Sequence, residues 1–269
     1  MTELAADTVP ATLDPSAGPT PGPRTLVFDV GGSGLKAVVL DASGQMISER
    51  VRVKTTYPCP PDRLVDELHG LAVQLPAAER ASVGFPGMVR SGVILSAPKF
   101  DTESGPGSPV SPTLQRAWRE FALGDALAAR LGVPVRVAND ADVQGAAVVA
   151  GTGFELVLTL GTGVGTAVFY DGMLLPHLEF AHHGFRKDQT YEEQLGELAR
   201  KEVGDERWVR RVGKAIDSLR ALTFFSRCYI GGGNAKRLPP DMAPDVTIVA
   251  NTAGLLGGIA LWDGRQPVA

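Results

Sequence analysis

The sequence predicts an α/β protein built as two lobes with a cleft between them. Hydrophobic runs of strand length alternate with stretches of helical periodicity, and this alternation occurs twice along the chain. A glycine-rich hairpin also occurs twice, at residues 25–41 and 156–170, about half a chain apart. Two similar hairpins indicate two related halves that face one ligand, and such a ligand is expected in the cleft.

Both hairpins contain a turn that suits phosphate. Glycines lack a Cβ, so neighbouring backbone N–H groups can point together into a concavity that binds an anion. In the first hairpin, Asp29 ends the leading strand and Lys36 follows early in the returning strand. The first turn is Gly31, Gly32, Ser33 and Gly34, and the second is Gly161, Thr162, Gly163, Val164 and Gly165. One such turn is typical of any hairpin; the repeat favours a phosphate-bearing ligand.

The first half of the chain begins with residues 1–24, which are rich in proline and alanine and which we expect to be a disordered tail. Helices are expected at residues 62–75, where Asp62 fits the N-cap, and at 114–131, where Gly132 fits the C-cap. Strands are expected at residues 25–30, 35–41, 45–53, 81–85, once within 91–100, and at 133–138. Residues 101–113 contain three prolines and two glycines and predict a mobile loop.

The second half repeats this alternation around the second hairpin. Asn139 is the expected N-cap of the helix that precedes the hairpin. The strand at 227–230 runs into Gly231, Gly232 and Gly233. Helices are expected at residues 140–150, 191–203, 206–222 and 252–261, and a last strand at 246–250.

Composition excludes several other classes of protein. A hydrophobic fraction of 44% with 21% charged residues is typical of a globular protein, and a net charge of −4 argues against a broad surface for nucleic acid or acidic lipid. No apolar run approaches the ~18 residues of a spanning helix, and the first residues lack the features of a secretory signal. We therefore expect a cytoplasmic protein with no nucleic-acid and no membrane partner. Cys59 and Cys228 are too few for a disulfide framework or a cysteine-rich zinc site.

Five segments follow one another in an informative order: residues 29–36, 85–87, 139–142, 160–166 and 230–233. Together with the spacing of Pro176, Glu179 and His182, they resemble the ROK family of sugar kinases and repressors, in the hexokinase and actin-like ATPase superfamily. The likeness runs from about residue 24 to 262 and, within the family, points to polyphosphate glucokinases and glucomannokinases.

The resemblance implies an actin-like ATPase (ribonuclease H-like) fold with a small lobe, residues 25–138 plus 253–263, and a large lobe, residues 139–252. It implies a kinase that transfers a phosphoryl group from polyphosphate or ATP to a hydroxyl of glucose or a related hexose, with Mg²⁺ and as a homodimer. Asp140 would be the general base. The pair Asn139-Asp140 is also typical of a helix N-cap with an acidic first turn, and both interpretations can hold together.

The resemblance also assigns the binding residues. Sugar contacts are implied for Asn139, Glu179, His182 and, by an approximate match, Glu192. Lys99 is a further expected substrate contact, and the implied Mg²⁺ ligand is Asp29. Phosphate or donor contacts are implied for Gly31, Gly32, Ser33, Gly34, Lys36, Gly161, Thr162, Gly163, Gly231, Gly232 and Gly233. Alone, Asp29 would be interpreted as a turn aspartate and Lys36 as a solvated strand residue. No cysteine lies between Cys59 and Cys228, so the zinc site of many ROK proteins is expected to be absent, with His177 and His183 as loop residues.

Three departures from the family pattern concern the acceptor. Lys99 stands where relatives usually have an asparagine, Ala181 replaces a glycine, and residues 101–113 are inserted over the expected mouth of the cleft; Trp118 either restores a family aromatic or is a core residue. The alternative function is therefore a ROK-fold protein with redirected or lost catalysis, or a sugar sensor. A repressor would need a winged helix that residues 1–24 cannot supply. Basic candidates for a polyphosphate groove, half of them expected to be solvated helix positions, are Lys187, Lys201, Arg207, Arg210, Arg211 and Lys214.

Overall fold

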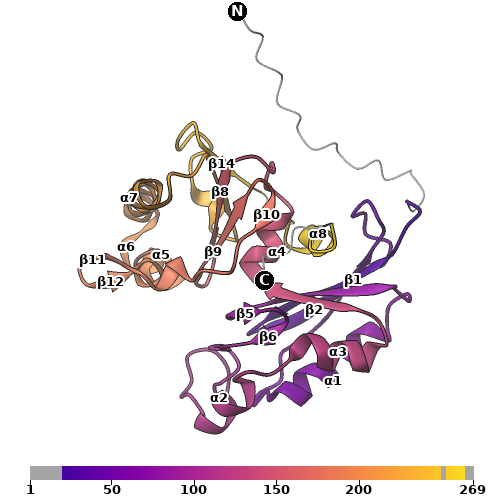
Figure 1. Cartoon of the computed structure of the whole chain (residues 1–269). Helices are drawn as coiled ribbons and strands as arrows, with labels where there is room; N and C mark the ends of the chain where they lie inside the picture. The colour runs from indigo at the N-terminus through magenta and orange to yellow at the C-terminus, as the bar shows by residue number, and fades with distance from the viewer. Residues whose placement is uncertain (1–19, 250–252, 264–269) are drawn as a thin grey trace, which may run out of the picture.

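The computed structural model describes residues 20–249 and 253–263 and contains two five-stranded sheets (Figure 1). The strand order is β3-β2-β1-β4-β7 in the first sheet and β10-β9-β8-β13-β14 in the second. In the first, β1 pairs antiparallel with β2 and parallel with β4; in the second, β8 pairs antiparallel with β9 and parallel with β13. This equivalence confirms the two related halves that the repeated hairpin predicts.

The long central strands of both sheets are buried on both faces, as expected when helices cover a sheet. The first sheet consists of β1 Thr25–Gly31, β2 Gly34–Leu40, β3 Val51–Val53, β4 Arg80–Phe85 and β7 Val135–Asn139. The second consists of β8 Phe154–Leu160, β9 Val164–Tyr170, β10 Met173–Leu174, β13 Arg227–Gly231 and β14 Val246–Ile248. Two short hairpins lie apart from them: β5 Val89–Arg90 with β6 Val93–Ile94, and β11 Gly184–Arg186 with β12 Gln189–Thr190.

Helices cover the sheets and join the halves. They are α1 Pro61–Ala72, α2 Pro112–Trp118, α3 Leu123–Leu131, α4 Asp140–Ala146, α5 Tyr191–Leu195, α6 Glu197–Val203, α7 Asp205–Thr223 and α8 Ala253–Ala260. Single 3₁₀ turns occur at η1 Phe180–His182 and η2 Ala235–Arg237. Helices α4 and α8 pack against each other between the sheets, α8 on β1 and α4 on β9 (Figure 1). A Cβ at Gly257 of α8 would lie 1.6 Å from the Val143 carbonyl oxygen, so this close crossing requires glycine.

Each half has its own main hydrophobic core. The first is centred on Phe28, Leu68 and Phe85, and the second on Leu158 and Trp208. Trp118 belongs to the first core, where it is 1% exposed and its indole N–H donates to the Cys59 carbonyl at 3.0 Å. Of the two interpretations of Trp118, the core tryptophan is therefore the one that the structure supports. The lobe boundaries given above stay a prediction.

Several local predictions are wrong for tertiary reasons. Asp62 is not the N-cap of α1, because the helix begins at Pro61 with Pro60 in the cap position. Asp62 lies in the first turn, where its negative charge interacts favourably with the helix dipole. The strand expected at 45–53 is reduced to Val51–Val53 plus an isolated bridge at Met46. The helix expected at 114–131 is two helices, because the segment between them pairs with β6 through Phe121.

Other predictions hold with altered ends. Gly132 caps α3 with a left-handed φ of 72°, as predicted. The helix expected at 191–203 is divided into α5 and α6 at Gly196. Of the predicted tail, residues 1–19 lie outside the described residues, whereas the Thr20 N–H donates to Asp41 and Arg24 pairs with Glu79. In the described part of the chain, no helix combines the length and apolarity needed to cross a membrane.

Candidate active site

The first glycine turn places Asp29 and Lys36 opposite each other in the β1–β2 register. Their side chains form an ion pair with Nζ 2.6 Å from Oδ2, and both are about one-third exposed. The turn is covered from one side, because a Cβ at Gly32 would come within 2.7 Å of Pro106 in the inserted loop and 3.4 Å of Lys99. The Tyr57 hydroxyl lies 2.8 Å from the Gly32 carbonyl and 2.9 Å from the Lys99 carbonyl. The inserted loop therefore packs on the first glycine turn. The mobility of the loop stays a prediction.

Asn139 ends β7 and caps α4, as predicted. Its Oδ1 accepts a hydrogen bond from the Ala141 N–H at 2.8 Å, and its Nδ2 donates to the Gly87 carbonyl at 2.9 Å. The side chain is 5% exposed. An amide that makes these two bonds keeps one N–H and one oxygen lone pair for other partners. The sugar contact of Asn139 stays a prediction, and these two groups are the ones that could make it.

Asp140 follows at the start of α4 and is partly exposed. Burial of its carboxyl group raises its pKa to about 6, Lys99 opposes this shift, and Asp29 adds to it. Asp29, Lys99 and Asp140 come from three separate segments, and the charges of Asp29 and Lys99 both act on the Asp140 carboxyl group. A carboxylate with a pKa near 6 is well matched to accept a proton at neutral pH.

Asp142, His177 and Glu179 form a triad near Asp140, with Asp142 and His177 buried and Glu179 partly exposed. His177 lies outside the helices and strands, as expected of a loop residue, but it is buried. His177 is 2% exposed at its side chain, and its Nδ1 lies 2.9 Å from Asp142 Oδ1 while its Nε2 lies 3.4 Å from Glu179 Oε1. Burial lowers the pKa of His177, but the two carboxylates outweigh it and raise that pKa to about 10. The two carboxylates thus favour the imidazolium form of His177, while burial raises the pKa of Asp142. His177 also holds the pKa of Glu179 below its usual value.

His182 is close to this triad and mostly exposed, with Nε2 3.9 Å from Glu179 Oε2. Glu179 and His182 thus lie together, whereas His183 is exposed just before β11. The sequence signal that could have found His177 is its spacing of two residues from Glu179. In the described residues, no group of three histidine, cysteine, aspartate or glutamate side chains could hold a metal ion.

The second glycine turn is held by a residue that the motifs did not single out. Asn234 Nδ2 donates to the Gly161 carbonyl at 3.1 Å and to Glu197 Oε2 at 2.9 Å, so it joins the turn at 161–163 to the one at 231–233. Gly232 has φ +88°, and a Cβ there would lie 2.4 Å from the Leu160 carbonyl oxygen. The two predicted donor turns are therefore neighbours.

Glu192 has a different neighbourhood from the one expected for a sugar ligand. A Cβ on Gly163 would lie 3.1 Å from its Oε2, so the Glu192 carboxylate borders the second glycine turn. Helix α5, which carries Glu192, also contacts η1, where His182 lies. Glu192 is thus between the predicted donor turn and the predicted sugar residues, and its role stays a prediction.

The resemblance implies Mg²⁺, and the side chains present fit it. Mg²⁺ keeps several waters and is usually bound by one or two carboxylates together with substrate phosphates. The Asp29 carboxylate is partly exposed, and its partner Lys36 carries its charge on a long, flexible side chain. The charge of Asp29 also acts on the Asp140 carboxyl group. Asp29 would hold the ion, which when bound supplies positive charge to the phosphate oxygens during transfer.

The paired sheets, with α4 and α8 between them, define the two-lobed actin-like ATPase fold. A sequence model described as the ROK family matches residues 25–179, and the chain belongs to the ROK family. It is 28% identical to the polyphosphate glucokinase of Mycobacterium tuberculosis (strain CDC 1551 / Oshkosh), over 90% of this chain and 94% of that protein.

Solved structures agree with this assignment. The inorganic polyphosphate/ATP-glucomannokinase from Arthrobacter sp. strain KM superposes with a TM-score of 0.73 at 27% identity, covering 90% of this chain and 98% of that one. A ROK family glucokinase from Streptomyces griseus in complex with glucose and AMPPNP has a TM-score of 0.70 at 19% identity, covering 88% and 98%, and supports the fold.

Proposed function

We propose that this protein is a hexose kinase that transfers a phosphoryl group from inorganic polyphosphate or ATP to a hydroxyl of glucose or a related hexose. The observation that carries the proposal is Asp140, a carboxylate with a pKa of about 6 that lies near both Lys99 and Asp29. The names of the relatives, polyphosphate glucokinase and polyphosphate/ATP-glucomannokinase, support the donor and acceptor classes. A cytoplasmic location and a homodimer are part of the same proposal.

The chain's own groups would divide the work as follows. Asp140 takes the proton from the acceptor hydroxyl as the new phosphorus–oxygen bond forms, and the positive charge of Lys99 favours its ionised form. Glu179, next to His177, accepts hydrogen bonds from sugar hydroxyls, with His182 close to it. Asn139 is a further sugar contact in this proposal. Backbone N–H groups of the two glycine turns bind the donor phosphates.

One experiment tests donor and acceptor together. The purified protein is incubated with a panel of hexoses, with ATP in one set and polyphosphate in the other, and sugar phosphate is measured. Asp140→Asn should abolish transfer while leaving folding and sugar binding largely intact, because the amide is similar in size but cannot take the proton. Turnover by this variant near the wild-type rate would show that the base is wrongly assigned.

A redirected acceptor is the second candidate, and two observations favour it. Lys99 acts on both Asp140 and Glu179, so it places a cation at the acceptor side that could meet a phosphate or carboxylate group of a substrate. Ala181 is fully buried in the second core, so its methyl group fixes the η1 turn that presents His182. ATP hydrolysis without phosphorylation of any hexose in the panel would support this candidate.

A further inference from the structure

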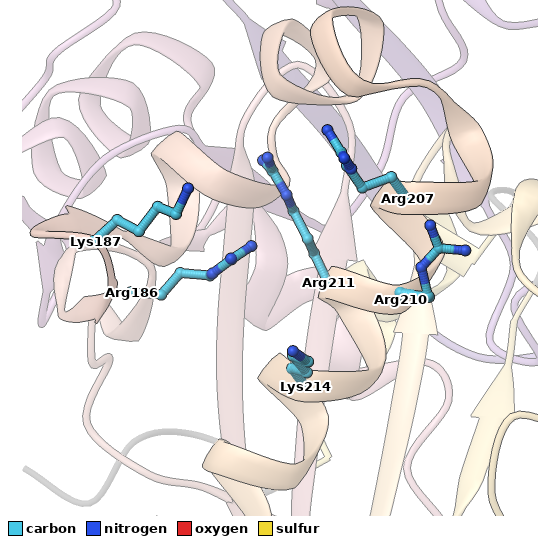
Figure 2. A pocket seen from close by; sticks show the side chains of 6 residues that line it. All are labelled: Arg186, Lys187, Arg207, Arg210, Arg211 and Lys214. Atoms are coloured by element: carbon cyan, nitrogen blue, oxygen red, sulfur yellow. The ribbon is translucent and has the colours of Figure 1, made fainter.

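A cavity of about 290 Å³ lies between the β11–β12 hairpin and α7, and every residue that lines it is basic (Figure 2). Figure 2 shows the two hairpin side chains pointing toward those of the helix. The lining residues are Arg186, Lys187, Arg207, Arg210, Arg211 and Lys214, and we call this cavity the basic pocket. Lys201, another basic residue of this region, does not line the pocket and instead pairs with Glu197 at 3.4 Å.

Most of this charge has no acidic partner. Of the six side chains, Arg210 is the one that forms an ion pair with a described residue, Glu206 at 2.5 Å. Arg186 and Arg211 contact only uncharged oxygens of Gln194, at 3.4 and 3.3 Å. Glu202 acts on Arg211 at longer range, against the repulsion from Arg186 and Arg207. Clustered like charges destabilise the fold unless an anion binds among them.

Arg211 is the pocket residue with a buried polar atom left unpaired in the described part of the chain. Its Nε is buried and has no hydrogen-bond partner among the described residues. Burial, followed by repulsion from Arg186 and Arg207, lowers its pKa. A guanidinium with a free N–H in a cavity of cations is well placed to bind a phosphate oxygen.

The pocket is held in shape by the elements around it. Lys187 and Asp188 both have positive φ, 53° and 57°, which gives the tight turn that brings Lys187 toward α7. Phe185 of the hairpin stacks on Tyr191 with ring centroids 4.6 Å apart, and the Tyr191 hydroxyl bonds to Ser218 of α7 at 2.8 Å. The hairpin and the helix are therefore fixed relative to each other without a ligand.

The arrangement of the basic side chains in a row favours a linear polyanion as the ligand. Arg207, Arg211 and Lys214 have i, i+4 and i+7 spacing and lie on one face of α7. This row extends about 10 Å along the helix, at about 1.5 Å per residue. A single phosphate would meet only part of such a row, whereas a chain of phosphates can follow it.

The short helix α5 connects the surroundings of the basic pocket with the second glycine turn, the predicted donor turn. Arg211 donates to the Gln194 carbonyl at the end of α5, and Glu192 of the same helix borders Gly163. A long donor molecule whose end lies at the glycine turn can therefore continue past α5 toward α7.

We propose that the basic pocket binds the part of a polyphosphate chain that is remote from the transferred phosphoryl group. The inference rests on the proposed function, because it assumes that polyphosphate is the donor. It predicts that the pocket contributes to the affinity for long chains and contributes nothing to ATP or to the chemical step.

The test uses a triple variant and a matched control. Lys187, Arg207 and Lys214 are exposed, so their joint change to glutamine removes three charges from the pocket without opening a core. The control changes Lys54, Arg116 and Arg227 to glutamine, three exposed cations elsewhere on the chain. Thermal unfolding confirms that both variants keep the fold.

We expect the pocket variant to bind long-chain polyphosphate about 10- to 100-fold more weakly than wild type in calorimetric titration, and with a weaker salt dependence. In turnover, KM for long-chain polyphosphate should rise by a similar factor with kcat unchanged, while KM for ATP and for tripolyphosphate stays the same. The control variant should match wild type in each measurement.

Binding and turnover separate the two proposals. If wild type binds polyphosphate, the pocket variant does not, and neither phosphorylates a hexose, polyphosphate binding at the pocket is supported, while the proposed function and the donor role of the bound chain are refuted. Phosphorylation of glucose with ATP alongside equal polyphosphate binding by the pocket and control variants would refute the pocket. A single-stranded oligonucleotide that competes as strongly as polyphosphate of equal charge would also refute it, because the site would then be a general polyanion surface.

Discussion

The buried pair Asp142–His177 gives the sharpest test of the acceptor side. Its side chains are 3% and 2% exposed and lie 2.9 Å apart, so neither can exchange its partner for water. Removing one member of such a pair costs about 3–5 kcal/mol, because the other charge is left buried alone. His177→Gln and Asp142→Asn should each lower the free energy of unfolding by about this amount.

The double variant distinguishes the pair from two independent core residues. Asp142→Asn with His177→Gln leaves two neutral side chains that can hydrogen-bond, so its loss should be smaller than the sum of the single losses by about 2 kcal/mol or more. Urea unfolding at pH 6, followed by tryptophan fluorescence, measures all four proteins of the cycle. Losses that add within about 0.5 kcal/mol would refute the reasoning.

The pH dependence adds a second measurement on the same proteins. The pKa of His177 in the folded protein is about 10, above the ~6.5 of an unfolded histidine. The free energy of unfolding of wild type should therefore exceed that of the double variant by its full amount below about pH 6.5, and this difference should disappear as pH rises toward 10. His177→Gln should also raise KM for the hexose more than it lowers kcat, because His177 holds Glu179 and does not contact the reacting atoms.

Two further predictions concern the base and the donor turn. The rate at low substrate concentration should rise with pH, with an apparent pKa of about 6 that belongs to Asp140. Lys99→Met should raise this apparent pKa by about one pH unit, whereas Lys99→Arg should leave it in place. An apparent pKa that does not move in Lys99→Met would contradict the assignment. Gly232→Ala should lower the unfolding free energy by about 2 kcal/mol or more and raise KM for the donor, since its Cβ would lie 2.4 Å from the Leu160 carbonyl oxygen. Gly233→Ala is the matched control because its Cβ would meet nothing within 4 Å, and equal loss in both variants would contradict the steric argument.

The sequence predicts local features well because their causes are local. Both glycine hairpins, the Asn139 cap and the Gly132 cap depend on residues within a few positions of one another, and the structure contains all four. Repetition of one hairpin was enough to predict the two related halves. The order of the motifs predicted the family.

Features that depend on distant partners were missed. The environment of His177 is decided by Asp142, which lies 35 positions away, so no window of sequence shows that this histidine is buried and charged. The break between α2 and α3 has the same origin, because Phe121 pairs with Ile94. Helical periodicity continues across that break, so the pattern predicts one helix where tertiary pairing makes two.

The two glycine turns are alike in sequence but differ in how the rest of the chain covers them. Gly32 is covered by Pro106 and Lys99, so the first turn is closed on the side of the inserted loop. A Cβ at Gly161 or Gly233 would meet nothing within 4 Å, whereas one at Gly163 would meet Glu192, so the second pair of turns is open at Gly161 and Gly233. In the proposed function, a donor longer than the transferred group would leave the site past this open side, toward α5 and the cations of α7. The proposed direction of the polyphosphate chain follows from this asymmetry as well as from the charge of the pocket.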